Sequence, residues 1–101
     1  MENGLKIFWT DNALKELQNT IEYLQEHWSE KELRSLAHNL EKTLELISNN
    51  PNIFQSSEYK KDIRRAVVMK LNTLYYRVNG NTVEFISFFS NRQNPIRRKL
   101  L

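Results

Sequence analysis

Apolar residues recur with one spacing in the first half of this chain and with another in the second half. In the first half, two stretches place them at alternating steps of three and four, which aligns them along one side of an α-helix. The pattern predicts two amphipathic helices whose apolar stripes face a core. The stripes are Leu14, Leu17, Ile21, Leu24 and Trp28 in the first helix and Leu33, Leu36, Leu40, Leu44 and Ile47 in the second.

Polar residues mark where these helices begin and end. Thr10 or Asp11 can cap the first helix through a side-chain oxygen. Ser29, followed three residues later by Glu32, has the pattern of a capping box for the second helix. The Asn-Asn-Pro-Asn run at 49–52 ends that helix. Because almost no chain separates the two helices, they are expected to form an αα-hairpin.

Strand-like segments stand on both sides of the predicted helices. Leu5–Trp9 is a short apolar run before a polar break, and segments 63–71, 73–78 and 82–89 are rich in β-branched and aromatic residues. The sequence therefore predicts an α+β fold. It consists of an N-terminal strand, an αα-hairpin and a three-stranded antiparallel meander, forming one twisted sheet with the helices on one face. Residues 1–101 are expected to form a single domain.

The link between the last two strands predicts their pairing. Asn79-Gly80 is a preferred pair for a two-residue type I′ hairpin turn, which would set Val78 opposite Asn81 and Tyr76 opposite Val83. Side chains alternate between the faces of a strand. The face expected to pack on the helices carries Leu74, Tyr76, Val78, Val83, Phe85 and Phe89; the opposite face carries Thr73, Tyr75, Arg77, Thr82, Glu84, Ile86 and Phe88.

That opposite face is predicted to be polar near the turn and apolar toward the chain end. Ile86 and Phe88 would form an exposed apolar patch, which requires a cover from the C-terminal tail or from another chain. If the alternation continues past the strand, Arg92 also lies on this face. Arg92 stands between Asn91 and Gln93, so its guanidinium can fork onto a phosphate or carboxylate, or tie the tail to a backbone carbonyl.

Charge divides the chain more sharply than its net value of +3 suggests. Residues 1–58 carry five Lys/Arg and ten Asp/Glu, whereas residues 59–101 carry ten Lys/Arg and two Asp/Glu. A basic second half indicates a polyanionic or acidic partner, and the alternative is that the charges solvate two different surfaces. The basic residues are Lys60, Lys61, Arg64, Arg65, Lys70, Arg77, Arg92, Arg97, Arg98 and Lys99.

Several kinds of site are excluded by residue content. There is no cysteine, and His27 and His38 have no convincing carboxylate set, so a metal centre is not expected. Two glycines, Gly4 and Gly80, cannot build a phosphate-cradling loop. No cofactor is expected. The N-terminal residues lack the pattern of a signal peptide, and no apolar run is long enough to span a membrane, so a cytoplasmic protein is expected.

The basic residues of the second half admit two interpretations. Tyr75 and Tyr76 add aromatic surface on which a nucleic-acid base could stack. Arg64, Arg65 and Lys70 could equally be a solvated strand edge. For Arg77 an ion pair with Glu84 is favoured, worth less than about 1 kcal/mol at a surface.

The order of elements resembles the RelE/ParE superfamily of toxins from type II toxin–antitoxin systems. WTDNALKELQNTIEYL is similar to the family's first helix, and DIRRAVVMKLNTLYYRVNGNTVEFISFFSNRQNP is similar to its three-strand core. The resemblance covers almost the whole chain and implies a toxin that inhibits growth and is neutralised by a cognate antitoxin protein. It suggests that the antitoxin covers Tyr75, Ile86 and Phe88, and the groove beside the helices.

The superfamily has two branches, and the resemblance implies a different target for each. RelE-like members cleave mRNA on the ribosome, and ParE-like members poison DNA gyrase without being nucleases. The cleaving branch is matched only in part: its two second-strand lysines fall near Arg64 and Ala66, its arginine before the third strand falls on Thr73, and its last arginine falls on Arg92. Its C-terminal tyrosine has no counterpart, with Arg98 nearest.

Cleavage of RNA needs a proton acceptor, a proton donor and stabilisation of phosphate charge. Arginine supplies only the last. In a nuclease, Arg64 and Arg92 would clamp the phosphate with help from Lys70; Tyr75, Tyr76, Glu84 and Lys70 are the candidates for proton transfer. We therefore expect a ParE-like gyrase inhibitor with target contacts at Arg64, Arg65, Lys70, Arg77 and Arg92. The alternatives are a ribosome-dependent endoribonuclease and a degenerate module that only binds its antitoxin.

Overall fold

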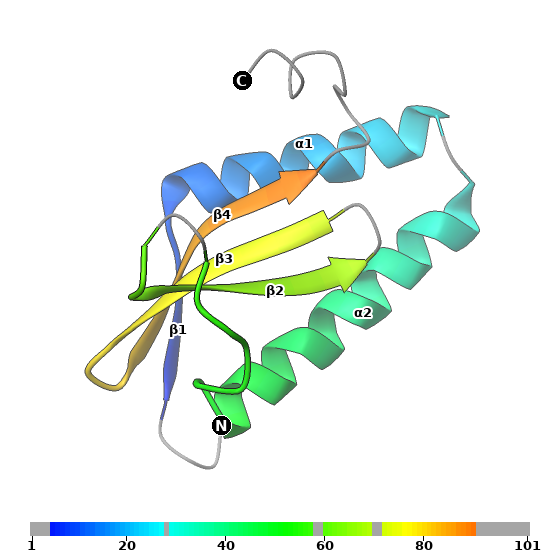
Figure 1. Ribbon diagram of the computed structural model, residues 1–101. Helices are drawn as coiled ribbons and strands as arrows, with labels where there is room; N and C mark the ends of the chain where they lie inside the picture. The colour runs from blue at the N-terminus through cyan, green and yellow to red at the C-terminus, as the bar shows by residue number, and fades with distance from the viewer. Residues whose placement is uncertain (1–4, 28, 58–59, 70–71, 91–101) are drawn as a thin grey trace.

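A computed structural model describes residues 5–27, 29–57, 60–69 and 72–90, which form two helices and a four-stranded sheet (Figure 1). The sheet order is β1-β4-β3-β2, with β1 parallel to β4 and the other neighbours antiparallel. No helix of the described part is long and apolar enough to cross a lipid bilayer. The elements are β1 (Lys6–Trp9), α1 (Asp11–His27), α2 (Glu30–Asn49), β2 (Ile63–Met69), β3 (Asn72–Asn79) and β4 (Thr82–Ser90).

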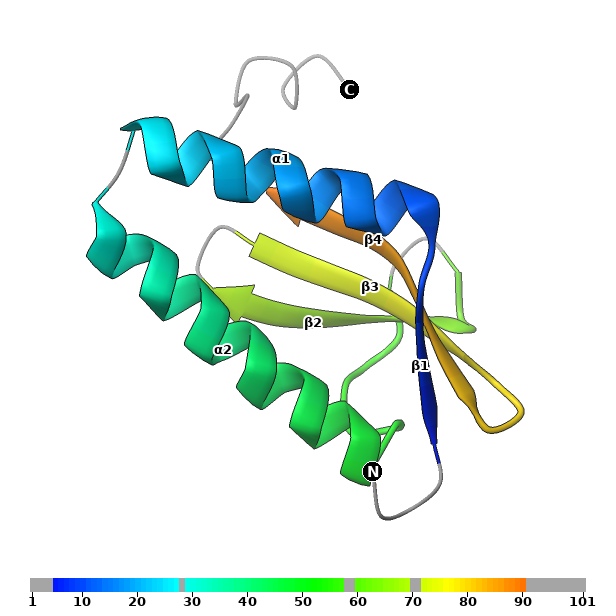
Figure 2. The ribbon, with the colours of Figure 1, turned by 180° about the vertical axis from the view of Figure 1, so that it is seen from behind.

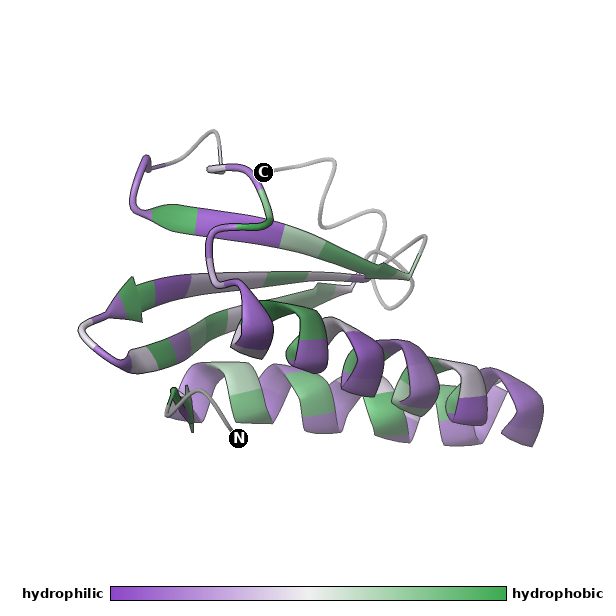
Figure 3. Ribbon diagram, turned by 90° about the horizontal axis from the view of Figure 1, so that it is seen from below, coloured by the Kyte–Doolittle hydropathy of each residue, from purple (hydrophilic) through white to green (hydrophobic). Residues whose placement is uncertain are grey.

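Both helices cover one face of the sheet, as the sequence predicted (Figure 3). Helix α1 packs on β4 and β1, whereas α2 packs on β2, and the two helices diverge from their shared link (Figure 2). The core between the layers contains Leu24 and Leu36 from the helices and Tyr76 and Phe85 from the strands, all at most 2% exposed. Among the described residues, no helix lies over the opposite face of the sheet (Figure 3).

Helix α1 begins where β1 leaves the sheet. Thr10 caps the helix, because its Oγ1 accepts a hydrogen bond of 3.2 Å from the backbone N–H of Ala13. The Thr10 hydroxyl also donates to the Phe85 carbonyl at 2.9 Å, which fixes how the first turn meets β4. Ala13 therefore enters the core and Leu14 is 48% exposed, so the predicted inward position of Leu14 is wrong. Trp28 lies outside the described residues.

Helix α2 buries the predicted stripe. Leu36 and Ile47 are buried, and Leu33, Leu40 and Leu44 are partly buried against them. Its start differs from the expected capping box, because the Ser29 side chain makes no capping hydrogen bond. Instead, the N–H of Glu32 donates to the backbone oxygen of Ser29 at 3.1 Å.

The hairpin between β3 and β4 turns one residue later than predicted. Asn79 pairs with Thr82, so the turn residues are Gly80 and Asn81, and Val78 pairs with Val83. Positive φ occurs only at Gly80 (65°) in the described part, whereas a type I′ turn needs it at both turn residues. The predicted turn type and pairs are therefore wrong. The faces near the turn are nevertheless confirmed, since the pairing moved by two residues and kept its parity.

A β-bulge in β4 reverses the predicted faces beyond the middle of the strand. Tyr76 pairs with Phe85 and Tyr75 with Ser87, which leaves Ile86 as the extra residue. Phe88 then pairs with Leu74 and is 1% exposed, so its predicted place on the exposed face is wrong. Phe89, expected in the core, lies on the opposite face.

The segment after α2 is held against the sheet by a buried tyrosine. The Tyr76 hydroxyl donates to the Pro51 carbonyl at 2.8 Å, and its ring meets that of Phe54 edge to face. Burial raises the pKa of the Tyr76 hydroxyl above its ordinary value, and the nearby positive charge of Arg64 opposes this shift. The neutral hydroxyl thus anchors residues near 51 to the core.

The bulge predicts that two adjacent phenylalanines contribute very different amounts to stability. Phe88→Ala should lower the free energy of unfolding by about 3–5 kcal/mol, because it empties a packed core site. Phe89→Ala should cost only about 1 kcal/mol, because its side chain is partly exposed. Urea denaturation of both variants checks this, and a larger loss for Phe89→Ala would contradict the bulged register.

The buried hydroxyl predicts a pH dependence. Since the pKa of Tyr76 is higher in the folded than in the unfolded chain, its stabilisation is complete below pH 10 and is lost as pH rises through the folded-state pKa. Stability measured by urea denaturation should therefore fall more steeply above about pH 10 in the wild type than in Tyr76→Phe. Parallel curves for the two proteins would show that the hydroxyl is not held neutral by the fold.

Candidate partner-binding face of the sheet

The candidate site is the face of the sheet that the helices leave uncovered, called here the outer face. Cross-strand pairing brings its residues into rows: Arg65 lies opposite Tyr75, and Tyr75 lies opposite Ser87. The strands that supply them alternate buried and partly exposed side chains, as expected when one face packs on a core. The described outer-face residues include Ile63, Arg65, Val67, Thr73, Tyr75, Arg77, Glu84, Ile86, Ser87 and Phe89.

Two shallow hollows lie along the outer face. One, of about 300 Å³, is lined by Ile63, Tyr75, Ile86, Ser87 and Phe89. Its lining is mainly apolar. The bulge turns both Ile86 and Ser87 toward this side. Tyr75 and Ile86 therefore lie together where the sequence predicted them, and Phe89 takes the place expected for Phe88.

The second hollow adjoins the strand at the edge of the sheet. It measures about 430 Å³ and is lined by Ile53, Phe54, Gln55, Arg65 and Val67. Val67 is 54% exposed and Ile53 is 46% exposed, so large apolar side chains remain open on this side of β2. Arg65 is thus an outer-face cation bordered by apolar side chains.

Arg64 has a structural role that the sequence did not reveal. Its guanidinium donates to the Phe54 carbonyl at 2.6 Å, and its strand position pairs with the buried Tyr76. It therefore lies on the parity of the inner face and fastens the segment after α2. One guanidinium nitrogen of Arg64 thus holds the segment after α2, and the role of Arg64 as a phosphate or target contact stays a prediction.

Arg77 forms the predicted ion pair. Its Nη2 lies 3.2 Å from Oε1 of Glu84, which is directly opposite it in the sheet, and its Nη1 lies 3.8 Å from Asp62. The Glu84 carboxylate is thus paired with a guanidinium. Lys60 and Lys61 are exposed before β2; Lys70, Arg92, Arg97, Arg98 and Lys99 lie outside the described residues.

The start of α1 contacts the bulge through polar side chains that the sequence did not single out. Oε1 of Glu16 accepts hydrogen bonds from the Ser87 hydroxyl at 2.8 Å and from the Phe88 N–H at 2.9 Å. Asn12 donates to the same oxygen at 3.2 Å and to the Ile86 carbonyl at 3.1 Å. Periodicity marks only apolar stripes, so it gave no signal for these residues.

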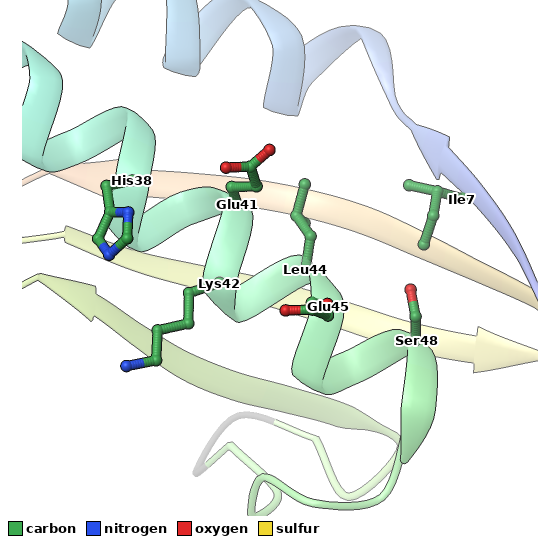
Figure 4. A pocket seen from close by; sticks show the side chains of 7 residues that line it. All are labelled: Ile7, His38, Glu41, Lys42, Leu44, Glu45 and Ser48. Atoms are coloured by element: carbon green, nitrogen blue, oxygen red, sulfur yellow. The ribbon is translucent and has the colours of Figure 1, made fainter.

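A third concave surface lies on the other side of the molecule, between α2 and β1. This groove, of about 690 Å³, is lined by Ile7, His38, Glu41, Lys42, Leu44, Glu45 and Ser48. Figure 4 shows Ile7 and Leu44 directed into the space between the strand and the helix. Across the described residues, no group of three or more His, Asp or Glu side chains could hold a metal ion.

Comparison with solved structures identifies the fold. A chain of the chromosomal ParDE toxin–antitoxin system from P. aeruginosa superimposes with a TM-score of 0.69 at 12% identity, covering 86% of this chain and 96% of that one. A chain of the E. coli DinJ-YafQ toxin–antitoxin complex gives 0.61 at 14% identity, covering 88% and 94%. The YoeB dimer from Staphylococcus aureus gives 0.60 at 16% identity, covering 85% and 95%.

Sequence comparison identifies the family. A search of curated proteins found no match. A family model described as the ParE toxin of the type II toxin–antitoxin system parDE matches residues 7–95, which include every helix and strand of the structure except the first residue of β1. The chain therefore belongs to the ParE toxin family of type II toxin–antitoxin systems.

Proposed function

We propose that this protein inhibits growth by acting on DNA gyrase, and that a cognate antitoxin neutralises it by covering the outer face. The observation that carries the proposal is the ParE family match over residues 7–95, taken with an outer face that the described chain leaves open. Apolar hollows of this kind fit a protein partner. Arg65, which lines the second hollow, favours an acidic segment in that partner.

The contacts of the charged residues in the sheet also favour a binding role over a catalytic one. Glu84 is paired with Arg77, and Arg64 is bonded to a backbone carbonyl, so two of the residues considered for RNA cleavage have other partners. A gyrase inhibitor needs no proton-transfer set. Arg65, and also Lys70 and Arg92, remain proposed contacts to the target.

One observation favours the alternative of a ribosome-dependent endoribonuclease. Arg65 and Tyr75 are cross-strand partners, and an arginine beside an aromatic ring can stack a nucleic-acid base. This pair could bind RNA, but a nuclease would also need groups that move protons. The third possibility is a degenerate toxin that retains only antitoxin binding.

Induced expression without an antitoxin separates these functions. Growth should stop, cells should filament with DNA-damage signalling, and purified protein should inhibit supercoiling by gyrase. Rapid truncation of mRNA with intact supercoiling would instead establish the nuclease. Unaffected growth, with the folded protein present in the cells, would leave only the antitoxin-binding module.

The proposed antitoxin surface predicts the effect of a buried charge. Ile86→Glu should raise the dissociation constant for the antitoxin at least about tenfold, because it sets a carboxylate in an apolar contact. Leu46→Glu is the matched control, since Leu46 is 40% exposed on α2, which covers the other face. The antitoxin would be taken from the adjacent small open reading frame and its affinity measured by calorimetry. Equal affinities for both variants would refute this surface.

A further inference from the structure

We propose that the Glu16 carboxylate fixes the register of the end of β4 and thereby decides which apolar side chains the outer face offers to a partner. Glu16 is then a positioning residue that acts through the strand rather than by touching the partner. The surface in question rests on the proposed function, whereas the register itself does not.

The sequence of β4 is compatible with two registers beyond Phe85. In the bulged register, the inner face beyond Phe85 receives Phe88 and Ser90. Without the bulge, regular alternation would send Ser87 and Phe89 there instead. Either register gives the core one phenylalanine and one serine, so the amount of apolar side chain buried differs little between them.

Polar bonds at the open edge of β4 favour the bulged register. Strand β1 ends at Trp9, opposite Phe85, and beyond that point α1 runs beside β4. Oε1 of Glu16 accepts from the Phe88 N–H and the Ser87 hydroxyl, at 2.9 and 2.8 Å. Hydrogen bonds to a carboxylate are stronger than those between neutral groups. In the regular register Ser87 would turn inward, away from this acceptor.

Neighbouring side chains also contact Oε1 of Glu16 and stabilise the bulge. The Asn12 amide donates both to Glu16 and to the Ile86 carbonyl, so it joins the carboxylate to the extra residue. Phe88 also packs opposite Leu74 and Ser90 opposite Asn72, which contributes to the bulged register. Loss of Glu16 should therefore populate the regular register beside the bulged one rather than replace it.

Buried polar atoms at this end of the sheet make the bulged register less favourable. Within the part of the chain that the structure describes, Ser90 Oγ and both polar side-chain atoms of Asn72 are buried without a hydrogen-bond partner. A buried polar group without a partner is unfavourable. The bulged register thus gives the Ser87 hydroxyl an acceptor, and the Glu16 contacts offset the cost of leaving Ser90 Oγ without a partner among the described residues.

The register of β4 determines which side chains a partner contacts on the outer face. In the bulged form, Ile86, Ser87 and Phe89 line the outer hollow beside Tyr75. In the regular form Phe88 would replace Phe89 and stand opposite Thr73 on that face. A partner fitted to the first surface would bind the second less well.

The test compares Glu16→Ala and Glu16→Gln with the control Glu22→Ala, which changes an exposed glutamate on the same helix. In the purified wild-type chain, NMR should show the Leu74 methyl groups near the Phe88 ring and a protected Phe88 amide. Glu16→Ala should add contacts that place Phe89 in the core and should speed exchange of the Phe88 amide at least about tenfold. Glu16→Gln should restore the wild-type pattern, because its amide oxygen still accepts both bonds.

An unchanged Phe88 amide and unchanged Leu74 contacts in folded Glu16→Ala would overturn the proposal. If Glu16→Ala does not fold, Glu16→Asp decides, since its carboxylate is one methylene short of the bulge. Faster exchange confined to the end of β4 supports the proposal, and wild-type exchange there overturns it. Antitoxin affinity should fall about twofold in Glu16→Ala if half of the molecules take the regular register, and should recover in Glu16→Gln. If the wild type neither arrests growth nor binds the antitoxin, the proposed function fails while the register result stands.

Discussion

The position of β4 between two different kinds of neighbour is the constraint on which the rest of the structure depends. On one side it pairs with β3 along its length. On its other side β4 pairs first with β1, and then contacts Thr10, which caps α1, and polar side chains of α1 itself. Because β1 and α1 both contact β4, the position at which β1 ends determines where α1 starts and how α1 is rotated about its axis. The inner and outer faces follow from that rotation and from the bulge.

The sequence predicted the elements of this fold well because they depend on local patterns. Helical spacing identified α1 and α2, and alternation identified the strands and the faces near the turn. The sequence-based prediction failed where a contact with a residue far away in the sequence determines which side chain is buried. Leu14 fits the apolar stripe, but the bonds of Thr10 to β4 rotate Ala13 inward instead. The bulge at Ile86 could not be read from β4, since its polar support comes from Glu16, more than seventy residues earlier.

The candidate site was predicted less completely, and for a physical reason. A count of basic residues cannot distinguish a cation that is free from one already bound. Arg64 and Arg77 both belong to the basic half, yet one holds a backbone carbonyl and the other holds Glu84. Arg65 remains on the outer face next to Tyr75. What the charge split indicated was therefore a basic half of the chain, of which only part is available to a partner.

The parallel pairing of β1 with β4 has a consequence for synthesis of the chain. Residues 6–9 can pair in the sheet only after residues 82–85 have been synthesised. A nascent chain therefore cannot complete its core until the last strand has left the ribosome. Contacts this far apart in sequence also slow folding. Until that moment the apolar faces of α1 and α2 lack most of the sheet against which they pack. A freshly made molecule is therefore exposed to proteases and to premature capture for longer than its small size would suggest.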